Sequence, residues 1–467
     1  MNFIQNEFVY FFIIVLVVYW TLRNRRYQNL LLMVCSGIFY GWVHPWFLLL
    51  LYGSALTDYF VGLGMEKYPQ RRKALLIVSL CVNLGMLGTF KYFDFFIENV
   101  IAAFGAMGME TSLHTLGIFL PVGISFYTFQ TMSYTIEVYR GRLQPRQNFS
   151  DYIVFVSFFP QLVAGPVERA THLLPQVEKE RVWNRQRFVS GLTLALWGGA
   201  KKVMVADTIA PYVDKIYLLD EPSGPMIWAA TIGFSIQILA DFSGYTDIAR
   251  GTARMLGFEL MENFKHPYLA VNPSDFWRRW HVSFSTWIRD YLYIPLGGSR
   301  GGFWGTIRAT FGAMLLSGLW HGASWNFVLW GAYHAALSTG YRQVAPRIPK
   351  KIKESPVGWP LAVVIMYMFS VIGWMIFRET NFSRLIGYWS QNPFHATPDQ
   401  WVATTVMLGM CLFASIPLVL ALFVQRWFPN VRQPWRLPIQ TTGWALCIVL
   451  MFLFVRMHLN DFIYFQF

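Results

Sequence analysis

The chain has 467 residues, of which 55% are hydrophobic and only 13% charged, and its formal net charge is +13. Soluble domains contain about 25% charged residues, so this composition excludes an ordinary soluble protein and predicts one that crosses a membrane many times. The excess of Lys and Arg does not indicate nucleic-acid binding, because the basic residues lie in short loops between apolar segments and form no continuous face for phosphates.

Apolar segments follow one another along most of the chain, and a helix needs about 20 apolar residues to cross a bilayer. The first, at 8–22, has no basic segment before it and no small-residue cleavage site, so we expect a first span and not a cleaved signal peptide. The predicted spans are 8–22, 29–43, 46–64, 74–90, 188–205, 225–242, 305–322, 324–341, 357–377, 402–424 and 439–457. Shorter or interrupted apolar stretches lie near 115–135 and 152–165, and the region 272–296 is amphipathic.

The basic loops predict how the chain is oriented. The loops at 23–28 and 66–73 are rich in Lys and Arg, whereas the turn between them at His44 is not. Because basic loops stay on the cytoplasmic side, we expect both loops inside and the N-terminus outside. Arginines between 426 and 436 precede the last span, which places the C-terminus outside as well. Two outer termini require an even number of crossings, and we expect ten to twelve.

We expect a single membrane domain over 1–467, since no change of composition and no repeat marks a second one. Residues 1–110 and 355–460 would form a frame of helices, and 461–467 an aromatic tail. In the part from about 115 to 341, polar and charged side chains interrupt the apolar runs. Such groups at membrane depth usually face protein or a water-filled path, and irregular backbone there must line a cavity. We therefore predict an all-α fold with broken or re-entrant helices around a polar chamber.

His321 is the first candidate for chemistry, because it lies in the run Trp320-His321-Gly322 at the junction of two predicted spans. Gly318 and Gly322 are four residues apart, so they remove side-chain bulk from one helix face and allow a helix or a substrate to approach. A neutral imidazole could take a proton from a hydroxyl near neutral pH. A structural histidine bonded to a carbonyl is the alternative, and the local sequence leaves both open.

His281 is the second candidate, at the end of the segment WRRWH (277–281). If this stretch is helical, Trp277, His281, Phe284 and Ser285 share one face, because residues three and four apart are neighbours. A histidine flanked by tryptophans and charges could equally lie in the headgroup layer of the membrane. The functional and the interfacial interpretation both stay open.

Other residue patterns narrow the chemistry further. His334 follows His321 by thirteen residues, about 20 Å along an unbroken helix, so we do not expect it at the same reacting centre. The four cysteines lie in apolar stretches without zinc-site spacing. The sequence has no HExxH, Walker A, dinucleotide or GxSxG motif. We therefore expect chemistry on histidine and polar side chains, with no metal and no bound cofactor.

Five segments of the chain resemble the signature of membrane-bound O-acyltransferases. More narrowly, they are similar to the bacterial branch that contains alginate O-acetyltransferase and the D-alanyl transfer protein of teichoic acid synthesis. The likeness covers nearly the whole chain, and several motifs in the same order are more specific than any one alone. The segments are 159–166, 241–251, 277–281, 291–298 and 319–326.

The resemblance implies a helical funnel and an O-acetyltransferase in the bacterial inner membrane. It would pass acetyl groups from a cytoplasmic thioester, with acetyl-CoA as the donor, towards a cell-surface exopolysaccharide such as alginate or a cellulose-like polymer. His321 corresponds to the family's catalytic histidine and His281 to a second, upstream functional position. A periplasmic partner protein would complete the transfer. Candidates for lining the chamber or binding the donor are Gln237, Asp241, Trp277, Arg278, Trp320, Trp325 and Asn326.

The aromatic tail 461–467 adds a further hypothesis. It is similar to the C-terminal tyrosine motif of the small partner protein in the D-alanyl system, where a tyrosine can accept the acyl group. Tyr464 is therefore a candidate acyl relay, and an aromatic belt at the membrane interface is the alternative. Two alternatives for the whole chain stay open: transfer of D-alanine or another acyl group to an envelope polymer, and a polysaccharide or lipid transporter.

Overall fold

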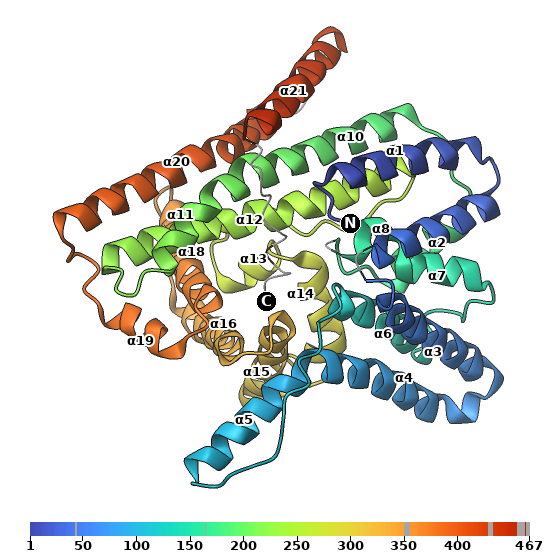
Figure 1. Ribbon diagram of the computed structural model, residues 1–467, viewed down its shortest axis with the longest axis horizontal. Helices are drawn as coiled ribbons and strands as arrows, with labels where there is room; N and C mark the ends of the chain where they lie inside the picture. The colour runs from blue at the N-terminus through green and yellow to red at the C-terminus, as the bar shows by residue number, and fades with distance from the viewer. Residues whose placement is uncertain (43, 164, 350–354, 428–432, 455–462, 464–467) are drawn as a thin grey trace. The chain divides into compact units, whose positions relative to one another are not determined.

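The computed structural model describes residues 1–467 except 43, 164, 350–354, 428–432, 455–462 and 464–467. Within the described residues every extended regular element is a helix and there is no strand (Figure 1). The prediction of an all-α chain with long apolar helices is confirmed.

Each predicted span falls on a helix in the described part of the chain. Five helical stretches are long and apolar enough to cross a membrane: Phe47–Lys67, Pro69–Ala106, Gly224–Met255, Gly358–Arg378 and Pro398–Phe423. Shorter apolar helices are Asn6–Thr21 and Thr441–Phe454. The expected number of membrane crossings, ten to twelve, stays a prediction.

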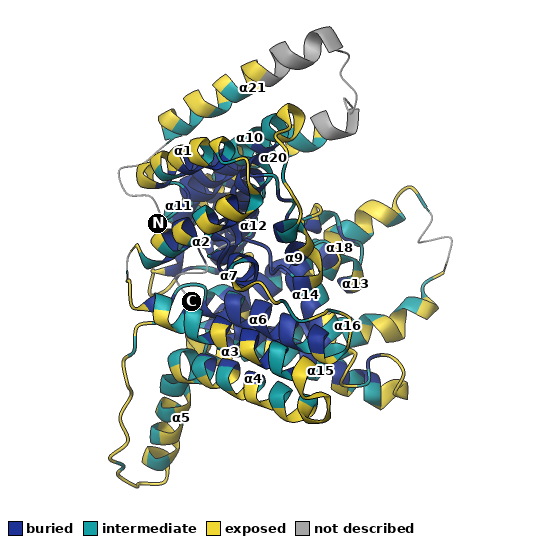
Figure 2. Cartoon of the chain, turned by 90° about the vertical axis from the view of Figure 1, so that its right-hand side faces the viewer, coloured by how far each residue is buried: buried dark blue, intermediate teal, exposed yellow. Residues whose placement is uncertain are grey.

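Helix α12 (Gly224–Met255) differs most from its predicted span, which ended at residue 242. Polar residues after that point, beginning with Ser243, interrupt the apolar run, yet the helix continues. It can do so because protein surrounds it: 83% of an apolar 18-residue stretch of this helix is buried. Figure 2 shows the contrast between the dark, buried α12 and the largely exposed α5 (Phe93–Ala106).

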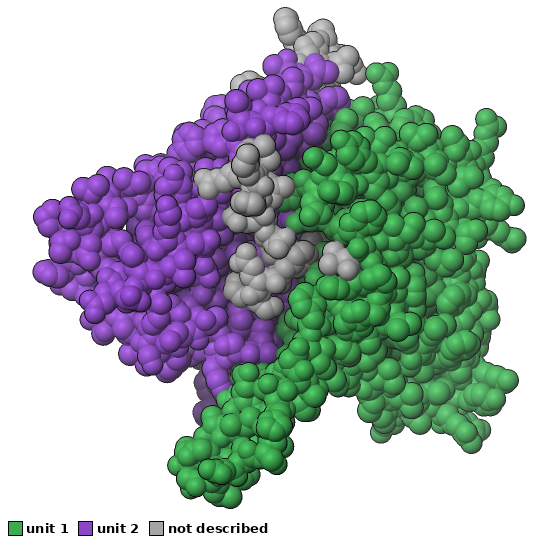
Figure 3. All heavy atoms as spheres, in the orientation of Figure 1, with its two compact units in different colours: residues 1–195, 248–261 green, residues 196–247, 262–467 purple. Residues whose placement is uncertain are grey.

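The chain divides into two compact units, coloured separately in Figure 3. Unit 1 comprises residues 1–195 and 248–261, and unit 2 comprises residues 196–247 and 262–467. Helices α10 (Arg185–Ala200) and α12 each run from one unit into the other along the chain. The prediction of a single membrane domain stays a prediction.

Buried carboxylates join the helices of unit 1. Asp58 of α3 (Phe47–Lys67) accepts a hydrogen bond of 2.8 Å from Asn83 of α4 (Arg72–Leu87). Asp151 of α7 (Phe149–Ser157) accepts bonds of 2.8 Å from Arg25 and 2.7 Å from Asn29, both on α2 (Arg25–Gly41). A buried polar or charged group is tolerated where it is hydrogen-bonded or paired, so these contacts fix how these helices pack. The other elements of unit 1 are α1 (Asn6–Thr21), η1 (Pro69–Arg71), η2 (Gly88–Tyr92), α6 (Ile124–Tyr139), α8 (Phe159–Leu162) and α9 (Ala170–Glu178).

Unit 2 is built around an antiparallel pair of helices, α15 (Gly302–His321) and α16 (Trp325–Val344). A Cβ on Gly318 would lie 2.0 Å from the carbonyl oxygen of Phe327, and one on Gly331 would lie 2.3 Å from that of Met314. Glycine at both positions therefore lets the two backbones touch, as predicted for Gly318. The remaining elements of unit 2 are η3 (Lys201–Ala206), α11 (Asp207–Tyr217), η4 (Pro267–Leu269), α13 (Pro273–Trp277), α14 (Val282–Ile288), η5 (Arg289–Tyr293), η6 (Ala345–Arg347), α18 (Gly358–Arg378), α19 (Phe382–Ser390), α20 (Pro398–Trp427) and α21 (Gln433–Phe454).

Candidate active site

His321 is the last residue of α15, so the prediction that it lies at the junction of two spans is confirmed. Its side chain is buried, and aromatic rings surround it. The centroid of its ring lies 5.0 Å from that of Trp320, 5.0 Å from that of Trp330 and 5.3 Å from that of Phe377. Because α16 begins four residues later, the rings of both helices and of α18 fix the imidazole at the turn.

His281 lies between α13 and α14 with a left-handed backbone, at φ 43° and ψ 55°. The expected single helical face through Trp277 and Phe284 is therefore wrong, because the helix breaks at this residue. The backbone of the break is bonded elsewhere: Val282 donates to the carbonyl of Asn263 at 3.0 Å. Strained backbone of this kind at a residue other than glycine concentrates at functional sites.

The side chain of His281 is fully surrounded, with 1% of its surface exposed. Its ring stacks on Phe284 at 4.9 Å and meets Phe242 edge-on at 4.7 Å. Neither ring nitrogen has a hydrogen-bond partner among the described residues. Burial lowers the pKa of His281 to about 3, so the ring is neutral at physiological pH. A buried polar group left unpaired is costly, which marks His281 as a group adapted to something other than packing.

Phe284 of α14 connects the two candidate histidines. Its ring centroid lies 4.9 Å from that of His281 and 5.7 Å from that of His321. The same ring stacks on Trp320 at 4.3 Å. Unit 2 thus brings both histidines, which are forty residues apart in the sequence, to one aromatic cluster.

His334 belongs to the same cluster, contrary to expectation. The ring of Trp330 lies 5.0 Å from that of His321 and 4.7 Å from that of His334. The expected separation assumed an unbroken helix, but the chain reverses at 322–324. Trp330 and His334 are four residues apart on α16 and so share a face, a signal that becomes useful only once the turn is located.

The other chamber candidates divide into buried and exposed groups. Trp320 and Asn326 are buried and Trp277 is half-buried, with the Trp277 ring 5.1 Å from that of His334. The side-chain amide of Asn326 donates to two carbonyls in the last turn of α18, at 3.3 and 3.2 Å. Such carbonyls have no partner within their own helix, so Asn326 has a structural role there. Trp325 and Arg278 are exposed, outside the aromatic cluster.

Asp241 lies in the middle of α12 and takes part in a buried ionic cluster. The Lys202 ammonium, on the π-helical turn η3, lies 2.7 Å from a carboxylate oxygen of Asp241 and 2.8 Å from one of Asp207. Sequence reasoning missed Lys202, although a lysine inside a predicted span calls for an acidic partner. Gln237 lies one turn before Asp241 and is half-buried.

The other carboxylate oxygen of Asp241 accepts a hydrogen bond of 2.8 Å from the backbone N–H of Ile463. Ile463 is buried. The next residue, Tyr464, lies outside the described residues, as does the rest of the tail after it.

Comparison with known proteins supports the resemblance found in the sequence. Residues 138–377 match the model of the membrane-bound O-acyltransferase family. The chain is 38% identical to the probable alginate O-acetylase AlgI of Pseudomonas aeruginosa, over 94% of this chain and 84% of that protein. It is 33% identical to a peptidoglycan O-acetyltransferase of Helicobacter pylori, over 77% of this chain and 72% of that protein. A teichoic acid D-alanyltransferase of Bacillus subtilis is 29% identical over 58% of this chain and 71% of its own length.

Proposed function

Because the chain belongs to the membrane-bound O-acyltransferase family, we propose that this multi-pass membrane enzyme transfers acetyl groups from a cytoplasmic thioester for O-acetylation of a cell-surface exopolysaccharide. The observation that carries the proposal is the aromatic cluster in unit 2 that holds both His281 and His321 beside Phe284.

In the proposed reaction, His321 is the general base. A hydroxyl attacks the thioester carbonyl carbon while His321 takes the hydroxyl proton, which gives a tetrahedral intermediate. The carbon–sulfur bond then breaks, an ester remains, and the thiol leaves with the proton. His281 would donate its single ring N–H to the oxygen of the intermediate, where a neutral donor in a buried setting is effective. Its lack of a hydrogen-bond partner among the described residues supports this role.

Acetyl-CoA is the donor that we propose, and alginate or a cellulose-like polymer the final acceptor. The supporting observation is coverage: the alginate O-acetylase relative aligns with 94% of the chain, and the D-alanyltransferase with 58%. Transfer of D-alanine is therefore the second candidate. Membership of an acyltransferase family does not support the alternative of a polysaccharide or lipid transporter.

We also propose that both termini lie on the periplasmic side of the inner membrane and that Tyr464 relays the acetyl group. The basic loops support the orientation. The bond between Asp241 and Ile463 supports the relay, because it holds the residue before Tyr464 in the protein interior. An acetyl group on a tyrosine still has to reach the sugar, so a periplasmic partner protein would complete the transfer. A broken-helix funnel would provide the path.

Replacing His321 by alanine tests the proposal in cells that lack their own copy of the gene and make the polymer. A lost general base lowers the rate by about 100- to 10,000-fold, so polymer acetylation is expected to disappear at equal membrane abundance. His395→Ala is the matched control, since His395 is exposed and outside the cluster. Unchanged acetylation in His321→Ala would refute the enzyme mechanism. Unchanged acetylation in Tyr464→Phe would refute the relay alone.

A further inference from the structure

A cavity in unit 2 lies at the far end of the α15–α16 pair from His321. It has a volume of about 440 Å³ and is lined by Ser299, Gly302, Phe303, Thr306, Ile307, Thr339, Arg342 and Gln343. Thr306 is fifteen residues before His321 on α15, about 22 Å along the helix axis. The cavity is therefore separate from the histidine cluster.

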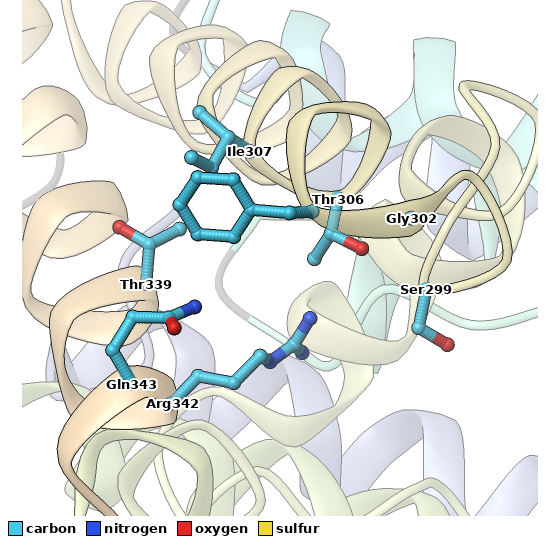
Figure 4. Close-up of a pocket in the computed structure, with 8 residues that line it drawn as sticks. Ser299, Gly302, Thr306, Ile307, Thr339, Arg342 and Gln343 are labelled. Carbon is cyan, nitrogen blue, oxygen red and sulfur yellow. The ribbon is translucent and has the colours of Figure 1, made fainter.

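The polar groups that line this cavity are suited to an anion. Figure 4 shows the Arg342 guanidinium reaching from α16 towards the first turns of α15, with Thr306 above it and the Gln343 amide beside it. Arg342 has no ion pair among the described residues, and no lining residue is acidic. Arginine binds phosphate through a fixed fork of N–H donors.

Thr306 adds a second polar group to the cavity. The residue is 7% exposed, and its side chain lines the cavity from the second turn of α15. A hydroxyl that lines a cavity can donate a hydrogen bond to an oxyanion bound there. Thr306 on α15 and Arg342 on α16 thus line the same cavity from two helices (Figure 4).

The surroundings place this space at the level of lipid headgroups. Phe303 is 50% exposed and Trp304 is 77% exposed, as expected of aromatic side chains at the membrane interface. Arg300 and Arg308 add two positive charges on the same part of the chain, and residues 299–308 and 339–347 contain no Asp or Glu. Basic loops of this kind face the cytoplasmic leaflet, where anionic lipids concentrate.

We propose that this cavity binds the phosphate group of an anionic phospholipid from the cytoplasmic leaflet, with Arg342 and Thr306 as its direct ligands. A phosphate of a soluble donor such as coenzyme A offers the same chemistry. The exposed Phe303 and Trp304 favour the lipid, because a soluble donor needs no apolar surface beside its phosphate.

Lipid retention by the purified full-length chain tests this proposal. Protein in neutral detergent is titrated with phosphatidylglycerol, with phosphatidylcholine and with coenzyme A, and binding is measured by native mass spectrometry. Phosphatidylglycerol is expected to bind in preference to phosphatidylcholine. Arg342→Gln is expected to weaken that binding about tenfold, the effect of losing a charge-assisted hydrogen bond. Thr306→Val tests the hydroxyl without changing charge or shape, and should weaken binding less.

Arg26→Gln is the matched control, because it removes the same charge from another exposed helix arginine, in the first turn of α2. Equal weakening in Arg342→Gln and Arg26→Gln would mean a general effect of surface charge and would overturn the proposal. So would unchanged binding in Arg342→Gln. If coenzyme A binds and Arg342→Gln abolishes its binding while phosphatidylglycerol is unaffected, the phosphate site stands and the lipid as its ligand is refuted.

Discussion

Replacing Lys202 by methionine removes the ammonium group that lies between Asp241 and Asp207. The side chain of Lys202 is 2% exposed, and its two carboxylate contacts are 2.7 and 2.8 Å long. Methionine matches the length of the lysine side chain, so the substitution takes away charge and leaves the space filled. It therefore isolates the electrostatic contribution of this cluster, which lies against the middle of α12.

Breaking a buried ion pair by removing one partner costs about 3–5 kcal/mol, because it leaves an uncompensated buried charge. Lys202→Met leaves both carboxylates without this partner, so we expect a loss of stability at the upper end of that range. Asp241→Asn should cost only about 1 kcal/mol, since Lys202 keeps its contact with Asp207 and the amide oxygen can still accept the N–H of Ile463. In the double variant the cost should be less than the sum of the two, by about 1–3 kcal/mol.

The free energy of unfolding is measured by Trp fluorescence during denaturation in mixed detergent micelles. Lys215→Met is the matched control, because Lys215 is exposed on α11, and it should change stability by no more than about 0.5 kcal/mol. If Asp241→Asn destabilises as much as Lys202→Met, or if the double variant is strictly additive, the cluster does not act as a coupled ionic unit and the reasoning is refuted.

Two further predictions concern other parts of the chain. The hydrogen bond of Glu168 raises the pKa of His172 above its ordinary 6.5, so this pair stabilises the fold fully below pH about 6.5 and loses its effect as pH rises through the higher folded-state pKa. The stability difference between wild type and His172→Gln should therefore shrink from pH 6 to pH 9 in thermal unfolding scans, and a constant difference would contradict it. Gly318→Ala should destabilise by about 1–3 kcal/mol through its clash with Phe327, whereas Gly340→Ala, with open space at its Cβ, should be neutral or stabilising by the same assay.

The sequence predicted the helices well because hydropathy measures what a lipid-facing helix needs. Hydropathy predicted helix bounds less well where a helix is surrounded by protein and not by lipid. The span ending at residue 242 failed because α12 continues with polar residues that pair inside the protein, as Ser243 does with Lys201 at 2.9 Å. Hydropathy counts such residues as polar and cannot see their partners.

The sequence identified the two histidines of the candidate site but not how the backbone arranges them. His321 and His281 were both identified, from a Trp-His-Gly run and a tryptophan-rich segment. The break at His281 could not be predicted, because it depends on the backbone hydrogen bond from Val282 to Asn263, nineteen residues earlier. His334 was not expected near His321, because the distance between them was taken along one unbroken helix. The helix in fact ends at His321. Lys202 gave a signal as a charge within a span, but its partners are on other helices.

The backbone contact between α15 and α16 has a mechanical consequence. Where Gly318 meets Phe327 and Gly331 meets Met314, backbone packs directly on backbone, and no flexible side chain separates the two helices. Sliding one helix along the other would drive carbonyl oxygens into the opposite backbone. We therefore expect the two helices to move as one rigid body. A displacement of the end of the pair that carries Thr306 and Thr339 would therefore reach His321 as a tilt of both helices together, without side-chain rearrangement between them.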